Sequence, residues 1–162
     1  MVLIRPAEEH EAPDVVRLWR AGWTGDHLEH VPAELLAERT EAYFVEEVDG
    51  MIGSTLVAVD ENTGTLLGVA LVDGEELCQL AVVSTARRRG IGAELVSAAE
   101  VLIAVAHERA ELGVAPGNAV ARRLYERCGW TDLGEVIMTV ERRRSSGEPI
   151  KVPVHHYVKQ LR

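Results

Sequence analysis

The sequence contains few cysteines, few aromatic residues and no long apolar run. Of its 162 residues only Cys78 and Cys128 are cysteines, and they form no Cys-x-x-Cys pair, so neither a zinc site nor a disulfide framework is predicted. No stretch approaches the roughly 18 uncharged apolar residues of a membrane-spanning helix. The first thirty residues contain no apolar segment typical of a signal peptide. We therefore expect a cytoplasmic protein with reduced thiols and no membrane partner.

Two further scarcities argue against nucleic-acid and metal sites. Aromatic residues, at 4%, are too few to interleave with arginines across a broad nucleic-acid-binding face. The six histidines show no metal-ligand spacing: His27 and His30 fall in a predicted loop, and His155 and His156 would point to opposite sides of a strand. We therefore expect neither a metal nor a nucleic-acid partner.

The composition predicts one globular domain over residues 1–162, with 47% hydrophobic and 27% charged residues. The charge is unevenly distributed. Residues 1–80 hold 17 acidic and 4 basic side chains, whereas residues 81–162 hold 9 acidic and 13 basic ones. This asymmetry leaves two interpretations open, namely halves that face ligands of opposite charge or an acidic surface that is simply solvated.

The spacing of apolar residues predicts an α/β (α+β) fold. The short helix at 118–128 begins at Asn118, a good N-cap, and ends before Gly129. In chain order, the predicted elements are a strand (3–5), two helices (7–21 and 32–47), an antiparallel meander of three strands (54–59, 65–72 and 77–83), a buried helix (91–105), a strand (111–115), a helix (118–128) and two strands (136–140 and 152–161).

The turn between the third strand of the meander and the buried helix has the features of an anion site. It reads ARRRGIGAEL over residues 86–95, which is a basic triplet followed by Gly90 and Gly92. A helix N-terminus presents unpaired N–H groups and a partial positive charge. Glycine lets a ligand approach the backbone closely because it has no Cβ. Strand, basic turn, Gly-x-Gly and helix together predict a pyrophosphate site.

Three phosphate-binding motifs can be compared with this turn. The P-loop string GxxxxGK(S/T) is absent, and the dinucleotide motif GxGxxG would need glycine at Leu95. The segment RRRGIG at 87–92 does fit Gln/Arg-x-x-Gly-x-Gly/Ala, the coenzyme A loop of the GNAT superfamily of N-acyltransferases. The segment GNAVARRLYERCGW at 117–130 resembles the second motif of that family. The chain is thus similar to GNAT proteins, and the similarity is strongest over residues 76–130.

The resemblance implies a fold, a cosubstrate and a set of binding residues. The fold would be a mixed, mostly antiparallel central sheet flanked by helices and splayed between its fourth and fifth strands. The cosubstrate would be acetyl-CoA, held by loop amides at its pyrophosphate and by a strand edge at its pantetheine arm. Asn118 would cap its helix, touch the cofactor or do both. The cofactor-binding residues that the resemblance implies are Leu80, Ala81, Val82, Arg87, Arg88, Arg89, Gly90, Ile91, Gly92 and Asn118.

The resemblance also implies catalytic roles. Tyr125 matches the tyrosine that protonates the departing coenzyme A thiolate, and the alternative for Tyr125 is a packed core residue. Relatives often carry a glutamate base where this chain has Cys78, so Glu76 would act as the base through a water. The alternatives are an exposed acid at Glu76 and a small core residue at Cys78. No histidine is placed in sequence to make Cys78 a nucleophile.

These inferences predict an N-acetyltransferase that transfers acetyl to a primary amine of a small molecule or peptide by direct attack. Because the first 80 residues are strongly acidic, we expect a cationic acceptor. A noncatalytic acyl-CoA sensor of the same fold and a nucleic-acid-binding protein that uses the arginine triplet are rival interpretations. The resemblance also allows a homodimer.

Overall fold

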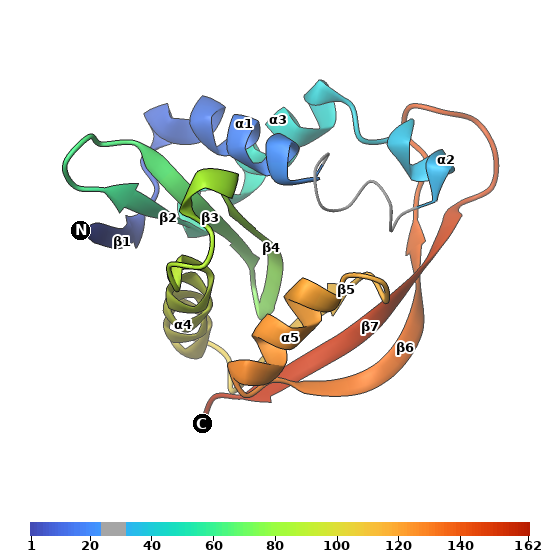
Figure 1. Ribbon diagram of the computed structural model, residues 1–162. Coiled ribbons are helices and arrows are strands. Elements are labelled where there is room, and N and C mark those ends of the chain that lie inside the picture. The colour runs from blue at the N-terminus through green and yellow to red at the C-terminus, as the bar shows by residue number, and fades with distance from the viewer. Residues whose placement is uncertain (24–31) are drawn as a thin grey trace.

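A computed structural model describes residues 1–23 and 32–162 of the chain (Figure 1). Its strands form a seven-stranded sheet in the order β1-β2-β3-β4-β5-β7-β6, in which every neighbouring pair is antiparallel except β4 and β5. The predicted α/β class, with a mostly antiparallel sheet, is therefore confirmed. The strands are β1 (Val2–Pro6), β2 (Thr55–Asp60), β3 (Leu66–Asp73), β4 (Glu76–Val82), β5 (Arg109–Val114), β6 (Thr131–Val140) and β7 (Ile150–Gln160).

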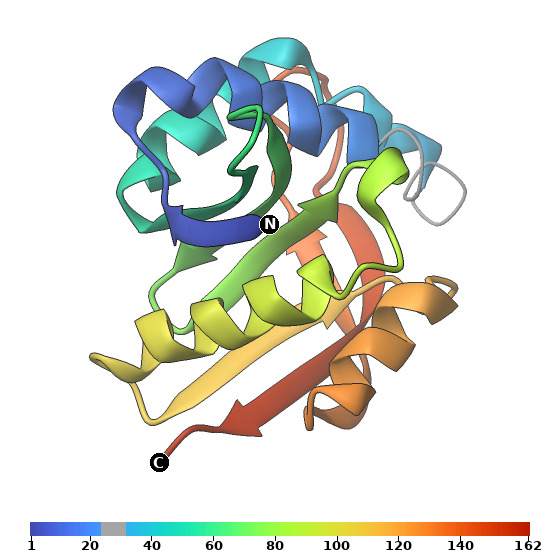
Figure 2. The same ribbon diagram turned by 60° about the vertical axis from the view of Figure 1, so that its left-hand side comes forward.

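Helices cover both faces of the sheet (Figures 1 and 2). One core contains the buried side of α4, including Leu95 and Ile103, with Tyr125 of α5. The other core contains α1 and α3 residues such as Val15 and Phe44. The helices are η1 (Glu9–Glu11), α1 (Ala12–Gly22), α2 (Ala33–Leu36), α3 (Glu41–Met51), η4 (Ile52–Ser54), η5 (Ser84–Ala86), α4 (Ile91–Ala104) and α5 (Ala119–Arg127).

The sheet is splayed between β4 and β5, as predicted. The two strands share a single register pair, Glu76 with Glu111, and then diverge. On its other side β4 pairs with β3 throughout, but the register slips between Leu71 and Val72, which leaves Cys78 as a bulge. A bulge bends its strand and increases the local twist. The chain therefore opens a gap in the sheet beside a bent β4.

The prediction of one helix over 32–47 is wrong. The chain forms the short α2 and then starts α3 after Thr40, whose side chain accepts a hydrogen bond from the Tyr43 amide at 3.2 Å. A threonine hydroxyl that caps a new helix competes with continuation of the previous one. The first helix also begins later than predicted, at Ala12, because Pro13 suits a first helical turn and Glu9–Glu11 forms a 3-10 turn before it.

Candidate functional site

A cavity of about 800 Å³ extends from the loop after β4 along the gap in the sheet. It is bounded by β4, the end of β5, one side of α5 along its whole length, the last part of β6 and the first half of β7. Of the binding residues that the resemblance implied, Leu80, Val82, Arg87, Arg88, Gly90, Ile91, Gly92 and Asn118 line this cavity. Tyr125 lines it too, but Glu76, Ala81 and Arg89 do not.

The basic loop adopts the conformation that exposes backbone amides. Arg88 and Gly90 have φ angles of 64° and 78°, and Gly90 is the N-cap of α4. Buried Ala86 anchors the start of the loop. The left-handed conformations of Arg88 and Gly90, on either side of Arg89, bend the backbone into a tight turn. The helix α4 begins immediately after this turn and presents its unpaired N–H groups there. The loop and the positive end of the helix thus form a concave site suited to phosphate oxygens.

Gly92 has a packing role that the sequence did not reveal. A Cβ at this position would lie 3.3 Å from Leu124 Cδ2 of α5, closer than an ordinary van der Waals contact. The absence of a side chain therefore lets α5 approach the first turn of α4. This approach places both helices around the same end of the cavity.

The edge of β4 that faces the gap is available for main-chain pairing. β5 pairs with β4 only at Glu76, so the segment from Leu80 to Val82 has no strand partner on that side among the described residues. An extended ligand can add to such an edge as a further strand would. The Ala81 side chain points the other way, to α1, where a Cβ on Gly22 would lie 3.2 Å from it.

Tyr125 is almost fully buried yet faces the cavity, with 7% of its surface exposed. Its ring packs 6.0 Å from Trp130 and 6.2 Å from Tyr157, measured between centroids. No described residue hydrogen-bonds its hydroxyl. Burial raises the pKa of Tyr125 above its ordinary value of 10. The phenol therefore stays protonated at neutral pH and has a proton to donate into the cavity.

Asn118 caps its helix and also lies on the cavity wall. Its side chain accepts a hydrogen bond from the Ala121 amide at 3.3 Å, which caps α5. The same residue lines the cavity. Capping therefore does not exclude contact with a ligand.

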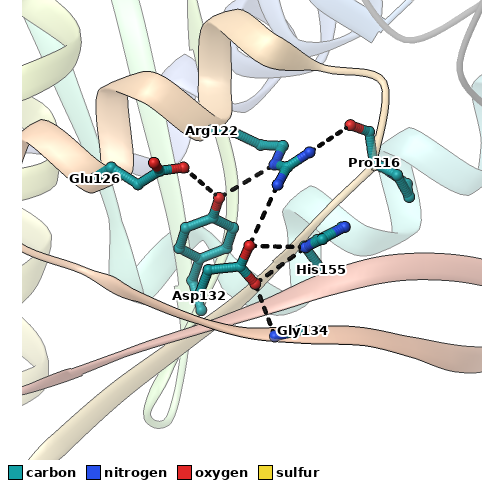
Figure 3. Close-up of polar contacts among 7 residues, drawn as sticks. Pro116, Arg122, Glu126, Asp132, Gly134 and His155 are labelled. Carbon is teal, nitrogen blue, oxygen red and sulfur yellow. Dashed lines mark hydrogen bonds and ion pairs between the residues drawn. The ribbon is translucent and has the colours of Figure 1, made fainter.

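A polar network on the far side of α5 fixes this helix to the sheet (Figure 3). Arg122 donates to the Tyr157 hydroxyl at 3.2 Å and to the Pro116 carbonyl at 2.9 Å. The Tyr157 hydroxyl donates in turn to Glu126 at 2.7 Å. These bonds hold the helix that carries Tyr125. The only sequence signal was the spacing of four between Arg122 and Glu126.

The same network continues onto the last two strands (Figure 3). Asp132 lies 3.3 Å from the Arg122 guanidinium and 2.8 Å from His155 Nδ1. It also accepts the Gly134 amide at 2.8 Å. Desolvation tends to raise the pKa of Asp132, but hydrogen bonds from the Gly134 amide and His155, together with the nearby Arg122 charge, hold it below its usual range. The partner of His155 is thus Asp132, on the side of β7 opposite to the side chain of His156.

Glu76 and Cys78 occupy neighbouring positions at the base of the gap. The Cys78 thiol lines the cavity and lies 3.7 Å from Glu76 Oε2, to which it donates. Burial, followed by the nearby Glu76 charge, raises the pKa of Cys78 to about 12. Partial desolvation raises the pKa of Glu76, and repulsion from Glu111 adds to it. The raised pKa values predict low thiol reactivity at Cys78 and a carboxylate at Glu76 that is more basic than an ordinary glutamate.

The described part of the cavity wall carries positive charge only. Its charged residues among those described are Arg39, Arg87, Arg88 and Arg127, and no carboxylate or histidine lines it. The acidic excess of the first 80 residues therefore lies outside the described wall and gives the expected cationic acceptor no support.

Other sequence expectations concern metals and membranes. The described residues contain no group of three or more side chains able to hold a metal ion. His27 and His30 lie outside the described residues. Among the helices of residues 1–23 and 32–162, none has the length and hydropathy required to cross a bilayer.

Comparisons with solved structures show the fold. A GCN5-related N-acetyltransferase from Rhodopseudomonas palustris aligns with a TM-score of 0.72 and 20% identity, over 98% of this chain and 94% of that one. An N-acetyltransferase from Staphylococcus aureus gives 0.71 and 13%, over 100% and 99%. A GCN5-related N-acetyltransferase from Kribbella flavida gives 0.69 and 20%, over 98% and 97%.

Comparison of the sequence with protein families identifies its class. No curated protein matches the chain. The model of the acetyltransferase (GNAT) family matches residues 12–130, which include both the basic loop and the segment around Tyr125. This chain therefore belongs to the GNAT family of acetyltransferases.

Proposed function

We propose that this protein transfers acetyl from acetyl-CoA to a primary amine of a small molecule or peptide, by direct attack within a ternary complex. The observation that carries the proposal is that one cavity joins the anion site at Arg87–Gly92 to the Tyr125 side chain. A cosubstrate whose pyrophosphate is bound at the anion site would extend its thioester toward Tyr125. The remaining volume beyond Tyr125 would receive the amine.

The loop amides and arginines would bind the cosubstrate by charge and by main-chain hydrogen bonds. The pyrophosphate would lie against the amides of residues 88–92 at the positive end of α4, with Arg87 and Arg88 beside it. Arg89 would contribute through its amide, since its side chain is not part of the wall. The pantetheine arm would pair with the edge of β4 from Leu80 to Val82, and Asn118 would flank it.

The transfer forms a C–N bond and breaks the thioester C–S bond. The amine attacks the carbonyl carbon, and the tetrahedral intermediate collapses with release of the thiolate. Tyr125 protonates that sulfur, and a proton lost by the amine returns to the phenolate through solvent. We assign the removal of the amine proton to Glu76, acting through a water, because its raised pKa makes it a better base.

One observation favours a noncatalytic acyl-CoA-binding protein as the alternative. No described residue of the wall is a carboxylate or histidine able to take the amine proton directly. A protein of this fold without a base would bind the cosubstrate and transfer nothing.

The two functions separate in one experiment. Thiol release from acetyl-CoA is followed with polyamines, aminoglycosides, amino acids and peptides as acceptors, and coenzyme A binding is measured by calorimetry. Acceptor-dependent thiol release is the expected result. Binding of coenzyme A without release for any acceptor would support the noncatalytic alternative, and absence of binding would refute both.

A further inference from the structure

The inner end of the cavity contains a guanidinium without an anionic partner. Arg39 lies between α2 and α3, lines the cavity and stacks on the Tyr43 ring, with its guanidinium carbon 4.1 Å from the ring centroid. None of the described residues forms an ion pair or a side-chain hydrogen bond with it. Glu38 and Glu47 influence its charge from beyond the 4 Å of an ion pair. Its own surroundings therefore leave a fixed positive charge facing the cavity.

Three charged residues near Arg39, namely Glu38, Arg142 and Arg144, already have partners within the protein. Glu38 is buried and its two oxygens accept hydrogen bonds from the amides of residues 143–145 and from the Ser145 hydroxyl. Arg144 pairs with Glu46 at 2.8 Å. Arg142 pairs with Glu34 at 2.9 Å. Arg39 thus differs from Glu38, Arg142 and Arg144, whose charges are paired within the protein.

Burial of an unpaired charge is unfavourable, and an anionic ligand would relieve it. Desolvation lowers the pKa of Arg39, although a guanidinium remains charged at neutral pH. The planar fork of arginine matches a carboxylate through two parallel hydrogen bonds. A single guanidinium neutralises one carboxylate fully, whereas a phosphate dianion would keep part of its charge.

The described residues that line this end of the cavity are mostly apolar. Leu35, Met138, Val152 and Val154 form its wall together with Trp23. Apolar walls favour a ligand with an apolar body. The charges of Arg39 and Cys78 both act on the pKa of Tyr43, so both residues lie near its ring. The guanidinium is therefore at the same end of the cavity as the bulge of β4.

We infer that the acceptor is an apolar amino acid, whose amine receives the acetyl group and whose carboxylate is bound by Arg39. This inference rests on the proposed function, of which it names the acceptor class. It replaces the cationic acceptor expected from total charge, because the wall contains an unpaired cation and no described carboxylate. Arg39 is thus a specificity-determining residue.

The test compares acceptors that differ only in the carboxylate. Thiol release is measured with leucine, methionine and phenylalanine, with their amides, and with spermidine. Arg39→Met removes the charge and keeps an unbranched apolar side chain. Arg143→Met is the matched control, because Arg143 is exposed in the neighbouring loop and does not line the cavity.

We expect the unmodified protein to prefer at least one amino acid over its amide by on the order of 10- to 100-fold in kcat/KM. Arg39→Met should abolish that preference through a higher KM for the amino acid while leaving the amide unchanged. Arg143→Met should keep the preference. Equal use of amino acids and amides, preference for spermidine, or an equal loss for acid and amide in Arg39→Met would overturn the inference.

A binding measurement separates this inference from the proposed reaction. The N-acetylated amino acids and their amides are titrated calorimetrically in the presence of coenzyme A. Tighter binding of the acids, lost in Arg39→Met, supports the carboxylate site even if no thiol is released, and in that case only the proposed transfer fails. Equal binding of acids and amides overturns the carboxylate site whatever the turnover.

Discussion

Replacement of Tyr125 by phenylalanine removes the proposed proton donor and little else. The hydroxyl has no hydrogen-bond partner among the described residues, and the ring contacts with Trp130 and Tyr157 do not involve it. A typical hydrogen bond contributes about 1 kcal/mol, and the Tyr125 hydroxyl makes none with the described residues. The substitution should therefore change the free energy of unfolding by less than about 0.5 kcal/mol. A general acid contributes about 10²- to 10⁴-fold in rate, and kcat should fall by that factor. Acetyl-CoA affinity should remain.

Tyr157→Phe provides the contrasting control. Tyr157 is fully buried, and its hydroxyl bonds to Arg122 at 3.2 Å and to Glu126 at 2.7 Å. Hydrogen bonds with charged groups contribute about 1.5–3 kcal/mol, so this variant should lose about 2 kcal/mol of stability. It keeps the Tyr125 hydroxyl, and any loss of turnover should be well below that of Tyr125→Phe.

The assay is thiol release with a saturating acceptor, accompanied by thermal and denaturant unfolding of each variant. Because burial raises the pKa of Tyr125 above 10, the phenol stays protonated over the usual assay range. The rate should therefore climb with pH as the amine loses its proton, without a fall caused by Tyr125 between about pH 7 and 9. An unchanged kcat in the phenylalanine variant would return Tyr125 to a packing role.

Three further outcomes are expected. Gly92→Val should weaken coenzyme A binding, as measured by calorimetry. It should also lower stability by about 1–3 kcal/mol, because the new side chain would meet Leu124. Unchanged affinity in the folded variant would contradict the phosphate site. Backbone hydrogen bonds, first from Arg143, lower the pKa of Glu38 to about 2, so its stabilisation is complete above about pH 4.5 and is lost as pH falls toward 2. Melting curves at neutral and acid pH should therefore show a smaller acid loss in Glu38→Gln than in the unmodified protein. Cys78, with a pKa of about 12, should react with iodoacetamide at pH 8.5 about 10³-fold more slowly than free cysteine, as mass spectrometry would show.

The parts of the site that the sequence predicted are those built from neighbouring residues. The strand, the basic turn and the start of α4 follow one another between Glu76 and Gly92, so local patterns were sufficient. Tyr125 follows Asn118 by seven residues, two turns along the same helix, so its exposure to the cavity on which Asn118 opens also followed from spacing.

The parts that the sequence missed depend on distant partners. The end of α2 is determined by Thr40 and by Glu38, whose carboxylate binds a loop more than one hundred residues later. The bulge at Cys78 depends on the pairing of β4 with β3. The cationic acceptor was inferred from total charge, which does not say which side chains face a cavity. Arg39 became a candidate only once Glu38, Arg142 and Arg144 were seen to be paired.

The bonds between Glu38 and the loop before β7 also have a consequence for how the protein is made. They join residues 105 to 107 positions apart, so the ribosome must release the chain through residue 145 before all of them can form. The hairpins of β2, β3 and β4 close over short distances and can pair much earlier. We therefore expect the nascent chain to form β4, the strand before the basic loop, well before the bonds of Glu38 beside the proposed acceptor site.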